Sequence, residues 1–246
     1  MHDLARRLIA VRIADTIKCR ARAFLCSTAF ADALRAYAES GGKLVLTGDT
    51  AFADQDGRPR TSLPEVFGFA PSGRDEYHCR KYKIFNLAGY VMPAENAADV
   101  LGDLAAKPVI PCVFRAQRVA PARNARVLAW IENRDTGTSY SRFLGPSADP
   151  AILVNPRGNV IYCAADVDAT YHINRGAVGA LLIRRLVEHL LGGACAIQTD
   201  APESVEISIR RQPHAGRVLV HLVNATSAAT RPIEDMVPVS DVGVKV

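Results

Sequence analysis

Two short polar segments hold the residues that could do chemistry, and each segment directly follows an apolar run. The candidate ligand-binding residues are Asp49 and Thr50 in the first segment, and Asp166, Asp168 and His172 in the second. In open α/β sheets, ligands bind in the loops beyond the carboxyl ends of the strands. If both apolar runs are strands of one sheet, these five side chains lie where such a sheet presents its ligands.

A purely structural role is the competing interpretation of the same residues. Asp49 and Thr50 have side chains that form turns and cap helices, and Asp166 could cap the backbone of a solvated loop at 167–175. A metal site needs several convergent ligands, and the two segments show no established ligand spacing. The sequence therefore predicts no metal, and it favours turn formation over ligand contact.

No motif for nucleophilic catalysis is present. The strained turn of hydrolases reads G-x-S-x-G or G-x-C-x-G, and the chain contains neither pentapeptide. Cys26 with His172, and His78 beside Cys79, are interpreted as incidental pairs. Gly41-Gly42 precedes a strand where a phosphate-binding loop would precede a helix, so no cofactor is expected.

Composition excludes two classes of protein. The 246 residues are 49% hydrophobic and 22% charged, which is too apolar for a disordered tail. No run of about 18–20 apolar residues occurs, so a membrane-spanning helix is not expected. The six cysteines form no C-x-x-C pair, and reduced thiols in a cytoplasmic protein are the interpretation that fits them best.

The formal net charge of +5 is concentrated near the amino terminus. Residues 1–22 hold six Lys and Arg against two Asp, a local net charge of +4, which leaves +1 for the rest of the chain. A nucleic-acid-binding domain would need a basic face on the folded part. Apolar stretches in this leader are too short for a secretion signal. We therefore expect no nucleic-acid partner and no membrane partner.

An alternation of helix and strand predicts the framework that positions the candidate residues. Ser27 or Thr28 can cap a helix that Gly41-Gly42 ends, and a strand follows at 43–47. A second strand at 160–165 precedes a helix from Gly176 to Leu191. Such alternation indicates a parallel sheet covered by helices.

The middle of the chain gives weaker patterns. Residues 75–92 are interpreted as extended, 94–106 as helical, 109–114 and 127–131 as strands, and 132–150 as a long surface loop. Residues 155–159 form a hairpin-like turn between the apolar runs on either side.

The last fifty residues change to a period of two. Apolar residues alternate with polar ones in segments 205–209, 218–224 and 242–246, which indicates half-buried antiparallel strands. Three strands are marginal by themselves, so we expect this β module to be truncated.

Several segments resemble parts of a known family, in the family's own order. Residues 33–50 place a helix, two glycines and a strand before TGDT, which is similar to the family's TGE(T/S) loop. LPEVFG at 63–68 is similar to its LADLFG segment, and GNVIY at 158–162 to its GKVVYF strand. VHLVN at 220–224 and PIEDMVPV at 232–239 are similar to VHLLN and PIxEVxPV at the start of its β domain.

Over residues 28–246 the chain therefore resembles the trimerisation domain of β-galactosidases and related glycoside hydrolases. The resemblance implies an α/β, flavodoxin-like parallel sheet flanked by helices, akin to class I glutamine amidotransferases. It divides the chain into an atypical basic segment (1–27), the trimerisation-like domain (28–195) and a partial C-terminal β-sandwich module (196–246). Residues 1–27 depart from the family's strand and LPN turn, which suggests a fragment or an altered start.

In these glycosidases the catalytic carboxylates lie on a (β/α) barrel of about 250 residues, and this chain has no room for one. The resemblance therefore implies a non-catalytic accessory and oligomerisation portion of a glycoside hydrolase, acting in carbohydrate metabolism as a homo-oligomer such as a trimer. Carbohydrate would be reached only through the missing catalytic domain. The alternative is a free-standing small-molecule hydrolase or binding protein on the amidotransferase-like fold.

Overall fold

The computed structural model describes residues 18–21, 27–48, 50, 52–58, 65–72, 89–112, 116–134, 143–174, 176–193, 197–202, 204–225 and 237–245. The chain divides into two compact units, Met1–Gly193 and Ala194–Val246. Among the described residues, no helix has the length and apolar character needed to span a membrane.

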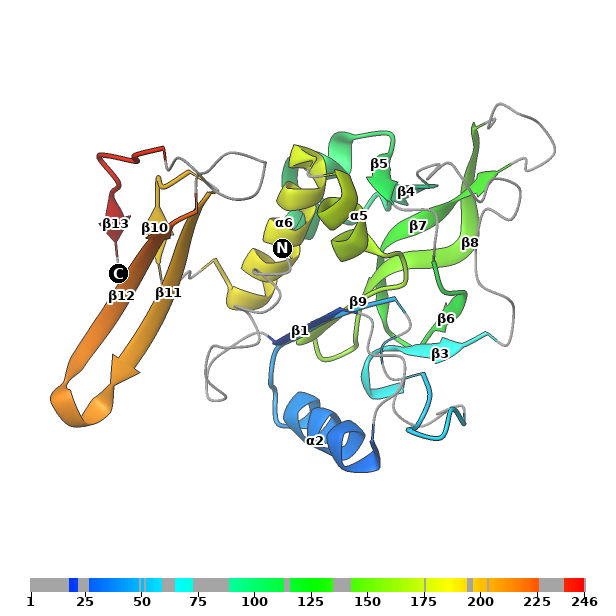
Figure 1. Ribbon diagram of the computed structural model, residues 1–246. Coiled ribbons are helices and arrows are strands. Elements are labelled where there is room, and N and C mark those ends of the chain that lie inside the picture. The colour runs from blue at the N-terminus through cyan, green and yellow to red at the C-terminus, as the bar shows by residue number, and fades with distance from the viewer. Residues whose placement is uncertain are drawn as a thin grey trace. The chain divides into compact units, whose positions relative to one another are not determined.

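The first unit is built on a seven-stranded mixed sheet (Figure 1). In spatial order its strands are β1 (Lys18–Ala21), β2 (Leu44–Thr47), β9 (Val160–Cys163), β8 (Phe143–Val154), β7 (Arg126–Arg134), β4 (Gly89–Pro93) and β5 (Ile110–Cys112). β1, β2 and β9 are parallel neighbours. The pairs from β9 through β8, β7 and β4 to β5 are all antiparallel. The fold class is therefore α/β, with a mixed sheet.

The flavodoxin-like parallel sheet that the resemblance implied is not found, because most of the strand pairs are antiparallel. The turn at 155–159 returns the chain from β8 directly into its neighbour β9. So short a connection joins antiparallel strands, whereas parallel neighbours need a crossover of a dozen or more residues. The predicted helix–strand alternation correctly describes only the parallel β2–β9 part of the sheet. The strand expected to be missing from residues 1–27 is present as β1, which pairs in parallel with β2.

The central strands are buried on both faces. β2 and β9 are buried along their whole length, and successive side chains of a strand point to opposite faces. Leu44, Leu46 and Tyr162 belong to one apolar cluster, whereas Val45 and Ile161 belong to another. Burial on both sides explains why these two strands have continuous apolar sequences.

Helices also contribute buried residues to both clusters. α2 (Thr28–Glu39) packs Ala31, Leu34 and Ala38 into the first cluster. The second cluster takes leucines from α6 (Ala177–Leu191), α4 (Ala98–Leu101) and the short helix η1 (Gly102–Ala106). Figure 1 accordingly shows α2 on one side of the sheet and α6 on the other.

Both predicted helix boundaries are confirmed. The Oγ of Ser27 accepts a hydrogen bond from the backbone N–H of Phe30 at 3.2 Å, as an N-cap does. Gly41 has a φ of +88° just after α2, and Gly192 ends α6 in the left-handed conformation.

A small two-stranded sheet of β3 (Phe69–Pro71) and β6 (Val119–Pro121) completes the first cluster. The ring of Phe69 stacks on Tyr162 of β9, with ring centroids 3.9 Å apart, and on Phe52, with centroids 5.6 Å apart. Three aromatic rings from distant parts of the sequence therefore pack in one row against the α2 side of the sheet.

The 155–159 turn ties the sheet to the end of α2. The Oδ1 of Asn155 accepts a hydrogen bond from the backbone N–H of Asn159 at 3.0 Å. The Nδ2 of Asn159 donates to the carbonyl oxygens of Ala38 at 2.7 Å and Gly42 at 2.8 Å. These bonds attach the turn to the last turn of α2 and to the glycine pair that follows it.

Two loop predictions are wrong. Residues 167–174 form α5 (Val167–Asn174) where a loop was expected, and residues 143–150 belong to β8, not to a surface loop. The helix expected at 94–106 is present as α4 and η1, and the strands expected near 109 and 127 are β5 and β7. Residues 73–88, 113–115 and 135–142 lie outside the described residues.

The second unit confirms the antiparallel strands that the period of two predicted. β11 (Val205–Gln212) and β12 (Arg217–Asn224) form a hairpin through the short helix η2 (Pro213–Ala215). β10 (Gln198–Thr199) pairs with β13 (Val244–Lys245). No described residue of this unit is buried, so, among these residues, the unit has no core of its own.

Candidate functional site

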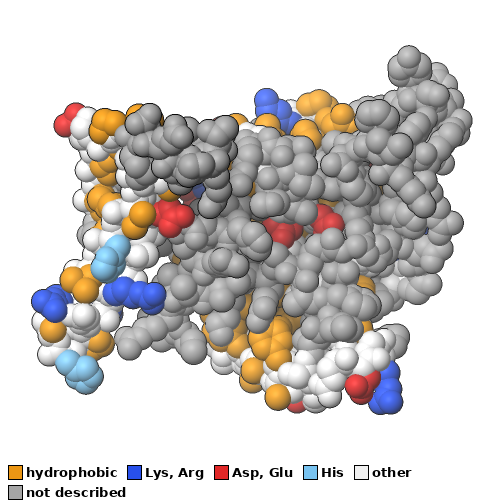
Figure 2. Space-filling model, viewed as in Figure 1, with side chains coloured by type: hydrophobic (Ala, Val, Ile, Leu, Met, Phe, Trp, Pro, Cys, Tyr) orange, Lys and Arg blue, Asp and Glu red, His pale blue; other side chains and the backbone are white. Residues whose placement is uncertain are grey.

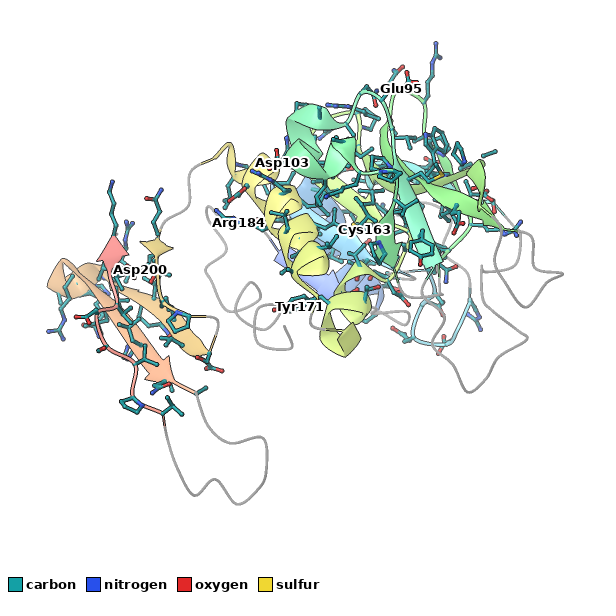
Figure 3. All side chains as sticks on the ribbon, turned by 90° about the horizontal axis from the view of Figure 1, so that it is seen from above. Glu95, Asp103, Cys163, Tyr171, Arg184 and Asp200 are labelled. Atoms are coloured by element: carbon teal, nitrogen blue, oxygen red, sulfur yellow. The ribbon has the colours of Figure 1, made fainter. Side chains whose placement is uncertain are left out.

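The two polar segments begin side by side at the carboxyl ends of β2 and β9. Thr47 and Cys163 are partners in the register of these strands. The backbone N–H of Gly48 donates to the carbonyl oxygen of Cys163 at 2.8 Å. Figure 3 labels Cys163 at this end of β9 and Tyr171 on α5, the helix that follows. This edge of the sheet is the candidate site.

Thr50 closes the turn after β2. Its side chain is buried, and its Oγ1 donates to the carbonyl oxygen of Thr47 at 2.6 Å. The hydroxyl of Tyr162 donates to the carbonyl oxygen of Gly48 at 2.6 Å. Both contacts hold the backbone of the turn, which is the structural role that the sequence favoured for Thr50. Asp49 lies outside the described residues.

Asp166 is buried at the start of α5, with only 3% of its surface exposed. Its carbonyl oxygen accepts hydrogen bonds from the backbone N–H of Thr170 at 2.9 Å and from the hydroxyl of Thr170 at 2.8 Å. The expectation of a solvated loop is wrong here, because residues 167–174 fold into a helix that packs the segment against the sheet.

Asp168 and His172 lie on the same helix. Asp168 is half-buried in the first turn of α5, where a negative charge interacts favourably with the helix dipole. The backbone of His172 belongs to α5, whereas its side chain lies outside the described residues. The structure therefore brings Thr50 and Asp166 to one edge of the sheet and places Asp168 two residues further along.

A buried thiol on β5 interacts electrostatically with Asp166. Burial, together with the smaller effect of the negative charge of Asp166, raises the pKa of Cys112 to about 12. The thiolate is the nucleophilic form of cysteine, and at neutral pH Cys112 is therefore a protonated, unreactive thiol. The Cys112–Asp166 arrangement does not provide an activated nucleophile.

Three further polar residues at this edge were not predicted from the sequence. Thr47, Gln117 and Thr170 are all buried. The backbone N–H of Gln117 donates to the carbonyl oxygen of Ala164 at 2.8 Å, beside the bridge between Ala116 and Ala165. Nothing local in the sequence signals this contact, because residues 116–117 lie almost fifty positions before their partners. Thr170 could have been noticed, since it lies one helical turn after Asp166.

The described part of the chain contains no group of three or more His, Cys, Asp or Glu residues arranged to hold a metal ion. Cys26, His78 and Cys79 lie outside that part. The hydroxyl of Thr50 and the carbonyl of Asp166 bind backbone and side-chain groups of their own segments. These groups of Thr50 and Asp166 therefore hold the local backbone at this edge.

Comparison with solved structures shows where this fold occurs. An α-L-fucosidase isoenzyme 2 from Paenibacillus thiaminolyticus matches 93% of this chain with a TM-score of 0.62 and 20% sequence identity. A β-galactosidase from Bacillus circulans sp. alkalophilus matches 93% with a TM-score of 0.58 and 13% identity. A β-galactosidase from Rahnella sp. R3 matches 79% with a TM-score of 0.54 and 16% identity.

The fold is that of a part of glycoside hydrolases. The chain spans 33% of the fucosidase, 31% of the Bacillus enzyme and 25% of the Rahnella enzyme. At these identities the likeness shows the fold alone. No protein-family model and no curated protein matches the chain.

Proposed function

We propose that this chain is a non-catalytic accessory and oligomerisation portion of a glycoside hydrolase-like protein, equivalent to the trimerisation domain of β-galactosidases. The proposal rests on the difference between the share of this chain and the share of each enzyme that a structural match covers. The matches cover 79–93% of this chain, yet the chain spans only 25–33% of each enzyme. A portion of that size corresponds to one module of a larger hydrolase.

The candidate site supports the same proposal. An acyl- or glycosyl-transfer centre needs an activated nucleophile or a pair of carboxylates that face the substrate. At the β2–β9 edge the hydroxyl of Thr50 is bonded to backbone, Asp166 is buried, and the Cys112 thiol is held protonated. In this proposal the catalytic carboxylates come from a barrel outside these 246 residues, and carbohydrate is bound there.

Oligomerisation and location complete the proposal. The working form is a cytoplasmic homo-oligomer, and a trimer is the expected state. Sister copies would bury apolar surface against one another and help to form the wall of a neighbouring active site.

Two measurements on the purified chain test this function. Sedimentation equilibrium is expected to give about three times the monomer mass of 26.5 kDa, and a monomer at micromolar concentration would contradict the oligomerisation role. Hydrolysis of p-nitrophenyl glycosides, including β-galactosides and α-fucosides, is expected to equal the buffer blank. Protein for this assay must come from a host that lacks β-galactosidase. Turnover would instead favour a free-standing hydrolase.

A further inference from the structure

The free end of the β11–β12 hairpin gathers positive charge. Arg210 and Arg211 lie just before the end of β11, Arg217 begins β12, and His214 lies in the turn between the strands. All four side chains are exposed. Figure 2 shows blue and pale-blue side chains at this end of the hairpin. We call these four residues the basic tip.

The sequence around the basic tip contains no opposing charge. Between Glu206 and Glu234 the chain has no Asp or Glu, so the three arginines of the tip are not neutralised by neighbours along the strands. Beyond residue 22 the net charge is only +1, because acidic residues elsewhere in the sequence offset the arginines of the tip. The hairpin is therefore a second basic segment of the chain, separate from the basic residues 1–22.

The strand register sets the positions of the three arginines along the hairpin. Gln212 and Arg217 are partners in the strand register, and the Nε of Arg217 donates to the Oε1 of Gln212 at 2.6 Å. Arg210 pairs with Leu219, so Arg210 and Arg217 are diagonal neighbours on the same face, about 7–8 Å apart. Arg211 projects from the opposite face. The arginines can therefore contact anionic groups on both sides of the strand ends.

The turn itself is also well defined. Gly216 has a φ of +61°, and its backbone N–H donates to the carbonyl oxygen of Pro213 at 3.2 Å. Proline fixes one backbone angle, and glycine adopts the left-handed conformation without strain. Pro213 and Gly216 therefore set the conformation of the turn that carries His214.

The residue types at the tip indicate which class of anionic ligand it can bind. Arg binds carboxylate, sulfate and phosphate groups through two parallel N–H donors. Single-stranded nucleic acids also need aromatic side chains on which bases stack, and residues 207–233 contain no Phe, Trp or Tyr. The arrangement fits a polymer that is recognised by repeated anionic groups alone.

We propose that the basic tip binds an acidic polysaccharide through the carboxylates or sulfates of its sugars. The choice of a polysaccharide rests on the proposed function, since a module of a glycoside hydrolase works beside glycans. The tip would hold the polymer near a catalytic domain without taking part in hydrolysis.

The test is a comparison of two triple variants in the full-length chain. The tip variant carries Arg210→Gln, Arg211→Gln and Arg217→Gln. The control variant carries Arg58→Gln, Arg123→Gln and Arg184→Gln, all at exposed positions of the first unit. Both variants lose three charges and keep the basic residues 1–22, so a general polyanion effect weakens them equally.

Binding to polygalacturonate is measured by affinity electrophoresis at two salt concentrations, with neutral dextran as the reference polymer. We expect the wild type to be retarded by polygalacturonate only, with a dissociation constant that rises with salt. The tip variant should bind at least tenfold more weakly than the wild type, and the control variant within twofold. Equal weakening of both variants, or no retardation of the wild type, would overturn the proposal.

Two further arms test charge recognition and the class of polymer. A tip variant with three Arg→Lys changes keeps the charge and should stay within threefold of the wild type. A loss as large as that of the Gln variant would overturn charge recognition. Tighter binding to duplex DNA than to polygalacturonate would identify the partner as nucleic acid and overturn the choice of a polysaccharide. The sedimentation experiment on oligomerisation does not depend on any of these binding measurements. The binding proposal can therefore be wrong while the proposed function holds, and the two outcomes can be told apart.

Discussion

At the scale of single residues, Gly68 makes the closest approach to another stretch of backbone among the described glycines. Its φ is +90°, and a Cβ built on it would lie 2.7 Å from the Cα of Asn155. Asn155 also donates from its Nδ2 to the carbonyl oxygen of Val66 at 3.2 Å. The segment before β3 therefore approaches the 155–159 turn more closely than any side chain would allow.

Gly68→Ala should destabilise the first unit strongly. Both Gly68 and Gly158 have positive φ, but a Cβ at Gly158 would meet nothing within 4 Å. Gly158→Ala therefore costs only the backbone strain, about 1–2 kcal/mol. Gly68→Ala adds overpacking against Asn155, which costs about 1–3 kcal/mol more. Urea unfolding of the two variants measures the difference, and equal midpoints would show that the close approach is not rigid.

Cys112 should resist alkylation as long as the protein is folded. Its pKa of about 12 leaves almost no thiolate at pH 8, and the thiol is buried. Treatment with iodoacetamide at pH 8, followed by peptide mass spectrometry, should find Cys112 modified only after denaturation in urea. Rapid modification in the native protein would mean an accessible, activated thiol and would reopen the hydrolase alternative.

At the scale of elements, an exposed ion pair joins the start of β7 to α4. The Nη1 of Arg126 donates to the Oδ2 of Asp99 at 2.8 Å, and its Nη2 contacts the other carboxylate oxygen and the carbonyl of Asn96. This bidentate contact lowers the pKa of Asp99 from 3.8 to about 2, with the hydrogen bond to Arg126 as the main cause. The pair attaches the short helical segment to the sheet.

This ion pair should make stability depend on acidic pH. Because the folded pKa is depressed, the stabilisation is fully present above about pH 4 and is lost as the pH falls from 3.8 towards 2. Both side chains are partly exposed, so the contribution is only about 0.5–1 kcal/mol.

The wild type and Asp99→Asn are compared by urea unfolding from pH 6 to pH 2.5. We expect the wild type to be the more stable at pH 6 and the difference to shrink below pH 4. Asp103→Asn, on the next turn, serves as the control for removing a nearby carboxylate. A difference that stays constant with pH would show that the pair does not form in solution.

At the scale of the whole molecule, the described core lies entirely in the first unit. Both apolar clusters are made of residues between Ala31 and Leu190. The second unit, from Ala194, has no buried residue in its described part. Two antiparallel strands without a covered face are marginally stable. The stability of residues 1–193 should therefore be independent of the second unit.

Truncation after Gly193 tests this independence. Trp130 is the single tryptophan of the chain and lies on β7 of the first unit, so its fluorescence reports the unfolding of that unit. The full chain and residues 1–193 should unfold at the same urea concentration. A clearly lower midpoint for the truncated chain would show that the second unit stabilises the first.

Local patterns were sufficient for the features that depend on neighbouring residues. The cap at Ser27, the glycines after α2 and the helix from Gly176 to Leu191 were predicted because capping and helical periodicity act within a few residues. The antiparallel hairpin of β11 and β12 was predicted from its period of two. In the candidate site, the adjacency of the segments after β2 and β9 followed from the parallel pairing of those strands.

Other features were missed because they depend on distant partners. Residues 167–174 have only a weak helical pattern, and their helix packs on α6 and β5 rather than forming from local preference. Gln117 and Cys112 reach the edge of the sheet from segments more than forty residues away from Asp166. Contacts between residues so far apart produce no periodic pattern in a single sequence.

The sequence by itself determined the α/β class, the main helices with their caps, the two buried strands and the amphipathic hairpin. Local propensity and side-chain alternation specify these features directly. Only the tertiary structure decided that the sheet is mixed, that Asp166 is buried and acts on the pKa of a buried thiol, and that three arginines lie at one hairpin end. Strand order, burial and the summed effect of nearby charges arise from long-range packing, which a linear pattern does not encode.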